Sequence, residues 1–306
     1  MNRNLILSGR LFLLLFISLG FIISGCNRGP KSEGSGDFEA SDGLDAETQA
    51  QLNTAKRIFY SLPSPLETAM LIKNAGAQYD EGLMNLTGNT SRYITAKSKA
   101  LNLGIYSTDL SYASLFDQTQ ATMNYIEAAK KMADGLNILN AINEETIQRL
   151  EEHINNRDVI IDIISETLMN SSSFLKENGL EATASVVLVG GWVEGLYIAT
   201  NLVNERSLKD NKLVERIVDQ KLSLDIMVNL LEESPEDADA MAVLEDVKSL
   251  KSIFDKITIK QGNVTAVEDP ATNVTTLKSE SSIHITPDVF RELRSKVIEI
   301  RTSYIS

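Results

Sequence analysis

The placement of its six prolines limits what this 306-residue chain can fold into more than any other sequence feature. Pro30 and Pro270 lie in polar stretches, and Pro63 precedes a predicted helix start. The remaining three prolines each follow a serine or a threonine, at Ser64-Pro65, Ser234-Pro235 and Thr286-Pro287. We read each of these three as the first residue of a helix, where the missing N–H costs nothing. No proline interrupts the long segments between them.

Apolar residues in these segments recur at helical spacing. The last segment shows this in steps of 3 and 4 residues, at Phe290, Leu293, Val297, Ile300 and Tyr304. Such spacing places the apolar side chains on one face of a helix. Helices are predicted over residues 46–60, 65–77, 91–114, 117–140, 144–176, 180–204, 208–232, 236–256 and 287–304. Because short connections make consecutive helices antiparallel neighbours, the sequence predicts an all-α, antiparallel multi-helix bundle.

Residues 257–285 are the exception. Two stretches in this region, 257–260 and 282–285, alternate between apolar and polar residues as strands do, around a middle rich in Thr, Asn, Ser and Gly. They predict either a short hairpin or an irregular loop. A two-stranded hairpin without further packing is only marginally stable, so we favour the loop.

The first 26 residues have the pattern of an export signal. Two arginines precede an apolar run over 11–23, which ends in Ile23-Ser24-Gly25-Cys26 with the only cysteine of the chain. A basic start, an apolar segment and small residues before a cleavage point are typical of a secretory signal peptide. An uncleaved membrane helix needs about 17–25 residues, and the 17 residues between Arg10 and Arg28 are at that lower limit.

The tetrapeptide ending at Cys26 also resembles the lipobox of bacterial lipoproteins. The resemblance implies cleavage before Cys26, attachment of diacylglycerol to its thiol and acylation of the new amino group with a fatty acid such as palmitate. Two or more acyl chains hold a protein stably on a membrane, whereas one holds it only marginally. By resemblance to the sorting rule of enteric bacteria, Asn27 in place of Asp favours the outer membrane, and we expect its periplasmic rather than its surface face.

The chain is therefore expected to have three parts. Residues 1–25 form the signal peptide, 26–45 the lipidated cysteine and a flexible linker rich in Gly and Ser, and 46–306 a helical domain. Removing residues 1–25 changes the net charge from −13 to −15, because that segment holds two arginines and no acids. This charge argues against binding nucleic acid or anionic lipid headgroups. With 43% hydrophobic residues, the rest of the chain can build a sizeable core without disulfides.

Residues 186–200 are almost entirely apolar, with Gly190, Gly191 and Gly195 among them and Glu194 near the centre. A second membrane span is one interpretation, but a carboxylate at its centre would be costly. We favour the buried central helix of the bundle, in which the glycines let neighbouring helices approach closely.

Two polar stripes at helical spacing are the candidates for a binding site. Glu194, Tyr197 and Asn201 share one stripe, and another combines three residues of the segment 104–118, namely Tyr106, Asp109 and Tyr112. A buried carboxylate must be paired, hydrogen-bonded or protonated. The stripes therefore predict either the lining of a polar core pocket or an internal hydrogen-bond network without a ligand.

No motif in the sequence indicates catalysis, a metal ion or a cofactor. The two histidines, His153 and His284, are far apart, and no nucleophile is placed beside a base. The stretches 64–67, 104–118 and 190–195 resemble all-helical envelope lipoproteins without assigned activity, a resemblance that implies the helical fold and no functional residue. We expect a non-enzymatic interaction or scaffold lipoprotein that binds an envelope protein through its helical surface. The alternative is a ligand-binding bundle with a polar core pocket.

Overall fold

Helices make up most of the computed structural model of this chain. It describes residues 72–73, 77–138, 144–154, 156, 159–160, 162–164, 166–167, 174–175, 178–205, 208–209, 211–260, 264–269, 274–279 and 282–306. The predicted signal peptide, Cys26, the predicted linker and the helix predicted over 46–60 lie outside the described residues, as does most of the helix predicted over 65–77.

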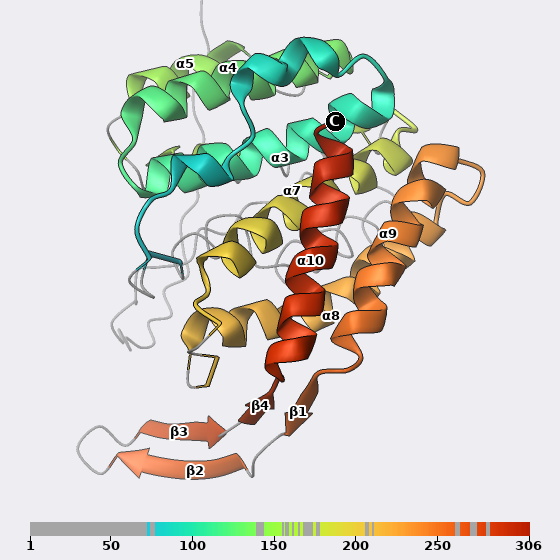
Figure 1. Cartoon of the computed structure of the whole chain (residues 1–306). Coiled ribbons are helices and arrows are strands. Elements are labelled where there is room, and N and C mark those ends of the chain that lie inside the picture. The colour runs from blue at the N-terminus through green and yellow to red at the C-terminus, as the bar shows by residue number, and fades with distance from the viewer. Residues whose placement is uncertain are drawn as a thin grey trace, which may run out of the picture. The chain divides into compact units, whose positions relative to one another are not determined.

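The described helices confirm the predicted all-α bundle (Figure 1). The α-helices are α3 (Ala96–Leu115), α4 (Thr119–Gly135), α5 (Glu144–Glu152), α7 (Glu181–Leu202), α8 (Lys212–Glu232), α9 (Ala238–Phe254) and α10 (Pro287–Tyr304). Two short 3₁₀ turns, η1 (Glu81–Leu83) and η2 (Thr87–Arg92), precede them. Short connections join α3 to α4 and α8 to α9, and each of these pairs packs side by side.

Local hydrogen bonds explain where α3 and α4 begin and end. Thr95 and Ser98 form a reciprocal capping box, so α3 begins at residue 96 rather than at 91 as predicted. Asp117 (φ 58°) and Asn137 (φ 59°) take the left-handed conformation directly after α3 and α4. In both cases the next residue donates its N–H back to a carbonyl five residues earlier, which closes the helix. The end of α4 therefore lies at residue 135, before the predicted 140.

Two helix predictions were wrong in detail. The predicted helix over 144–176 is broken, because α5 ends at Glu152 and His153 begins a turn. The Asn156 side chain accepts the N–H of Val159, which favours a new helix start there. Pro235 is not the first residue of a helix either: it lies in a turn, and Asp237 caps α9 through the N–H of Ala240.

Helix α7 is the centre of the bundle, as predicted, with α3, α8, α9 and α10 all packed against it (Figure 1). It is long and apolar enough to cross a membrane by length and composition, yet half of its apolar window is buried within the protein. Its buried residues include Val189, Val193 and Ile198. This packing is typical of a core helix.

The contact between α3 and α7 is the most extensive in the described structure, and glycines make it possible. A Cβ atom on Gly104 would lie 2.0 Å from the Val187 carbonyl oxygen, and one on Gly190 would lie 2.3 Å from the Leu101 carbonyl oxygen. Neither backbone could accommodate a methyl group without moving. The two helices therefore touch backbone to backbone at these positions, and the Thr108 hydroxyl spans the contact by donating to the Gly191 carbonyl at 3.0 Å.

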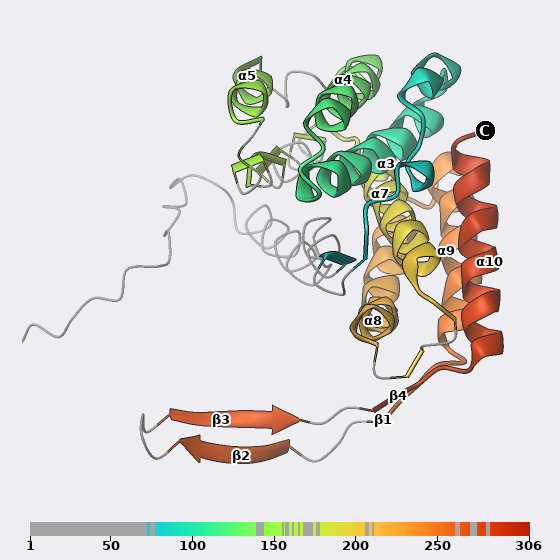
Figure 2. The same cartoon turned by 60° about the vertical axis from the view of Figure 1, so that its left-hand side comes forward.

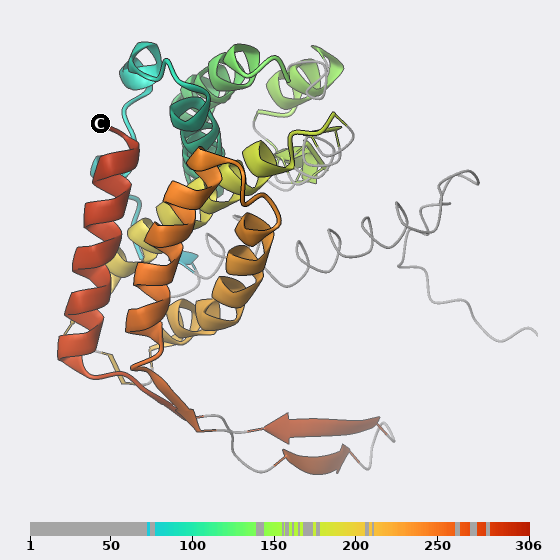
Figure 3. The ribbon, with the colours of Figure 1, turned by 90° about the vertical axis from the view of Figure 1, so that its right-hand side faces the viewer.

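The four strands described within residues 258–284 form a two-part β-ribbon rather than the loop we favoured. Strand β1 (Thr258–Lys260) pairs antiparallel with β4 (Ser282–His284), and β2 (Val264–Asp269) with β3 (Val274–Ser279). Figures 2 and 3 show the ribbon extending away from the ends of α9 and α10. No described helix has an extensive contact with β2 or β3, so the hairpin forms without a helical face to cover it.

We expect Gly190→Ala to lower the free energy of unfolding by about 3 kcal/mol or more, because overpacking against fixed backbone forces the helices apart. Gly88→Ala is the matched control, since a Cβ there meets nothing within 4 Å. Urea unfolding followed by circular dichroism measures both. Equal stability of the two variants would contradict the backbone contact between α3 and α7.

Candidate functional site

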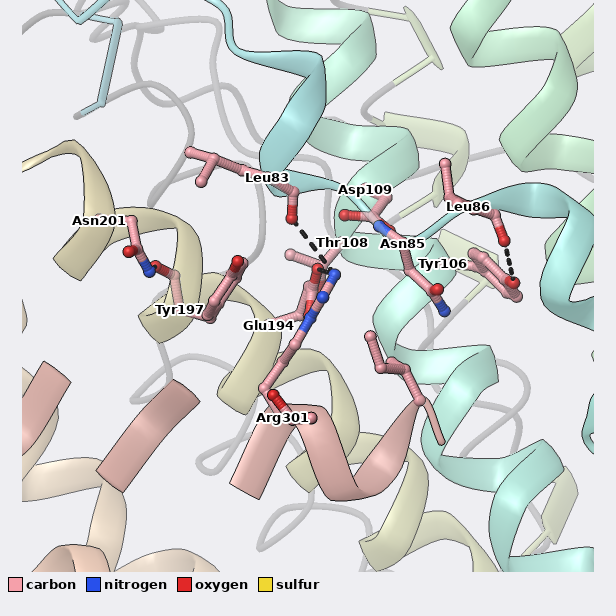
Figure 4. Close-up of polar contacts among 12 residues, drawn as sticks. Leu83, Asn85, Leu86, Tyr106, Thr108, Asp109, Glu194, Tyr197, Asn201 and Arg301 are labelled. Atoms are coloured by element: carbon pink, nitrogen blue, oxygen red, sulfur yellow. Dashed lines mark hydrogen bonds and ion pairs between the residues drawn. The ribbon is translucent and has the colours of Figure 1, made fainter. Parts of the chain in front are cut away.

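Three charged side chains from three different helices meet in the core. Asp109 comes from α3, Glu194 from α7 and Arg301 from α10 (Figure 4). The two carboxyl groups are fully buried, and Arg301 is 8% exposed. Such groups are rarely buried unless they are paired. This cluster is the most unusual chemical feature of the described residues.

Glu194 and Arg301 form a bidentate ion pair. The Arg301 Nε and Nη2 atoms each donate to one Glu194 oxygen, both at 2.9 Å. The guanidinium also lies 4.4 Å from the centre of the Tyr197 ring, a cation–π distance. Although burial opposes it, Glu194 raises the pKa of Arg301 overall, so the guanidinium stays charged. Burial also raises the pKa of Glu194, and Arg301 counteracts that rise.

Asp109 is held differently. Its Oδ2 atom accepts the backbone N–H of Asn85 at 3.0 Å, while Oδ1 has no N–H or O–H donor among the described residues. Burial, and then the charge of Glu194, raises the pKa of Asp109 well above its ordinary value. The Asn85 N–H and Arg301 counteract this rise but do not cancel it. Asp109 is thus the group of the cluster whose charge is least compensated.

The polar stripe of α3 binds the backbone of residues 80–86, a segment that we call the strap. The strap contains η1, and side chains from α3, α4 and α10 hold it by its main-chain atoms. Tyr112 accepts the N–H of Asp80 at 3.1 Å, and Tyr106 donates to the carbonyl of Leu86 at 3.0 Å. The other three bonds run from Asn85 N–H to Asp109, from Tyr125 to the Asn85 carbonyl and from Arg301 to the Leu83 carbonyl.

The Asn85 side chain anchors the strap to the C-terminus of the chain. It is 1% exposed and donates to the Tyr93 hydroxyl and to Asn102 Oδ1, both at 3.0 Å. Asn102 in turn donates to the carbonyl of Tyr304 at 2.9 Å, in the last turn of α10. Hydrogen bonds therefore connect the strap, α3 and α10 into one buried network.

The predicted stripes thus meet, but the protein's own chain occupies the space between them. Tyr106, Asp109 and Tyr112 contact the strap, and Glu194 lies beside Asp109 with Arg301 against it. Tyr197 lies against the guanidinium, to the left of the ion pair in Figure 4. Asn201 takes no part in the cluster, because its amide donates to the Tyr197 carbonyl within its own helix.

Sequence analysis missed Asn85, Tyr125 and Arg301. Arg301 had a detectable signal, since it lies four residues after Val297 and so falls on the apolar face of α10. Arg294 follows Phe290 in the same way, and it donates to the Thr200 and Val203 carbonyls at the end of α7. Asn85 and Tyr125 had no comparable signal.

Within the ranges that the structure describes, no group of three or more His, Cys, Asp or Glu side chains is arranged to hold a metal ion. Comparison with protein-family models, with curated proteins and with solved structures found no match. The chemistry of the cluster is therefore argued from its own geometry.

We expect Glu194→Gln to lower the free energy of unfolding by about 3–5 kcal/mol, because it removes the bidentate counter-ion of the buried Arg301 charge. A ligand-binding role for Glu194, by contrast, would have allowed this change with little loss of stability.

The matched control is Glu205→Gln, which removes the carboxylate that pairs with Arg294 at 2.5 Å but is 38% exposed. Its expected cost is within about 1 kcal/mol, as for other solvent-exposed pairs. Thermal and urea unfolding measure both variants. A stable Glu194→Gln protein would show that the ion pair does not support the fold.

Proposed function

We propose that this protein is a non-enzymatic interaction lipoprotein, anchored to the bacterial outer membrane by acyl chains on Cys26. The lipobox-like Ile23-Ser24-Gly25-Cys26 and the polar linker after it support the anchor. A flexible linker of this kind holds a folded domain close to the membrane and leaves it free to rotate. The net charge of −15 after cleavage keeps that domain away from anionic headgroups and nucleic acid.

The β-ribbon is the observation that most favours an interaction role. Strands β2 and β3 form a two-stranded sheet, so within the described residues each has one edge whose backbone groups are not paired in a ladder. Open edges of this kind add strands from other chains. Among the described residues this hairpin has no extensive contact with a helix, so it contributes little to the core and we expect it to contact other molecules.

The contacts made by the buried cluster also favour an interaction role over ligand binding. The acidic and phenolic groups predicted to line a pocket already contact Arg301 or the strap. A small ligand in that position would have to displace residues 80–86 first. The helical surface and the ribbon need no such rearrangement to bind an envelope protein.

Cys26→Ala should abolish metabolic labelling of the protein with a fatty acid, because the thiol that accepts diacylglycerol is gone. Asn27→Asp is the matched control: it keeps the label but should move the protein to the inner-membrane fraction of an enteric host, following the sorting rule. Both are measured by labelling and membrane fractionation. Label that persists in Cys26→Ala would refute the anchor.

The ribbon can be tested by placing a photo-crosslinking amino acid at Thr275 in β3, and at Met123 on α4 as the helical control. Met123 is 46% exposed, so it reports contacts of the helical surface. We expect a discrete adduct with one envelope protein from position 275 in intact cells. An adduct from position 123 alone would assign binding to the helices, and none from either position would contradict the interaction role.

A further inference from the structure

The charges of the buried cluster do not balance if both carboxyl groups are ionised. Asp109 and Glu194 would then carry two negative charges against the single positive charge of Arg301, and all three are almost wholly removed from water. Both oxygens of Glu194 bond to Arg301, whose Nη2 atom also reaches the strap at the Leu83 carbonyl. An uncompensated charge in such a place costs several kcal/mol, and buried groups avoid the cost by taking up a proton.

The contacts of Asp109 indicate that it is the group of the cluster that takes up the proton. The charge of Glu194 raises the pKa of Asp109, so the two buried carboxyl groups interact directly. Two ionised carboxylates are both acceptors, so a hydrogen bond between them requires a proton on one. Glu194 is already engaged by the guanidinium, and Asp109 Oδ1 is fully buried without any N–H or O–H donor. The proton therefore belongs on Asp109.

The other groups around the pair supply no charge that changes this balance. The elements packed against it contribute these titratable side chains: Tyr79, Asp80 and Glu81 from the strap and the residue before it, Tyr106 and Tyr112 from α3, Tyr125 from α4, and Tyr197 from α7. Burial raises the pKa of Tyr79 to about 12 and that of Tyr106 and Tyr125 further, so these phenols stay neutral. Asp80 and Glu81 are exposed to solvent.

We propose that Asp109 is a protonated carboxylic acid at neutral pH, that it donates a hydrogen bond to Glu194, and that the strap stays closed only while this proton is held. On loss of the proton, two carboxylates would face each other in a dry site. Helices α3 and α7 cannot separate easily, because Gly104 and Gly190 hold them backbone to backbone. The strap is held by individual hydrogen bonds to its main chain, so it is the element that opens and admits water.

The direction of the pH effect follows from the number of protons bound. A raised pKa means that the folded protein binds more protons than the unfolded chain between about pH 4 and the pKa of buried Asp109. The contribution of the Asp109 proton to the stability of the folded protein is complete below that pH window. It is lost as the pH rises through the window. Strap opening releases one proton, so its equilibrium constant should increase by about tenfold per pH unit between about pH 4 and the raised pKa of Asp109 in the closed protein, and level off above that pKa.

Two measurements test the proposal. The first is an infrared pH titration of the wild-type protein, which should show the C=O stretch of a buried protonated carboxyl group at pH 7. That band should be absent from Asp109→Asn, whose amide keeps the shape and can donate to Glu194. If the band is missing from the wild-type protein, Asp109 is ionised and the proposal fails. If it persists in Asp109→Asn, the proton is on another group and the assignment is wrong.

The second measurement is amide hydrogen exchange of residues 79–93 between pH 6 and pH 10, corrected for the intrinsic exchange rate. Protection of the strap should fall with rising pH in the wild-type protein and remain constant in Asp109→Asn. Asp246→Asn is the control, because Asp246 accepts a hydrogen bond from Tyr304 on α10 but does not contact the strap. Its pH dependence should match the wild type. Equal pH dependence in all three proteins would overturn the strap mechanism, and neither measurement depends on the lipid anchor.

Discussion

The backbone contact between α3 and α7 is the constraint on which the rest of the structure depends. Gly104 and Gly190 bring the two helices so close that no side chain or water separates them there. Asp109 and Glu194 lie about one helical turn beyond these glycines, so the same approach forces their carboxyl groups together out of solvent. The buried charge is thus a consequence of close packing, and the remaining contacts of the core compensate for it.

Helix α10 supplies that compensation through two arginines seven residues apart on its apolar face. Arg301 neutralises Glu194, and Arg294 donates to the carbonyl groups at the C-terminus of α7, where the helix dipole favours a cation. Both interactions connect the last helix to the central one. A buried ion pair adds little net stability compared with apolar packing, but it penalises every arrangement that separates the partners. The arginines therefore fix where α10 lies along α7.

Helix α10 also connects the β-ribbon at one of its ends with the strap at the other. Strand β4 leads into its first turn, and Arg301 near its other end donates to the strap at the Leu83 carbonyl. The carbonyl groups at its C-terminal end accept hydrogen bonds from Tyr93 and Asn102, which bind the Asn85 side chain of the strap. The strap follows the segment of chain that leads from Cys26, the proposed site of the anchor. Helix α10 therefore connects the β-ribbon, the proposed binding element, to the strap.

The sequence by itself determined most helices, because caps and apolar spacing act over a few residues: the helix predicted over 287–304 matches α10. Glu194 was identified because it interrupts an apolar helix, and Asp109 because it shares a helical face with Tyr106 and Tyr112. The break after Glu152 and the β-ribbon were predicted wrongly, because the local preference for helix, strand or turn is weak at both places. Only the tertiary structure decided that Arg301 pairs with Glu194, 107 residues away, and that the strap fills the space beside them. Such partners are chosen by packing and desolvation across the folded core, and no short-range pattern in the chain encodes them.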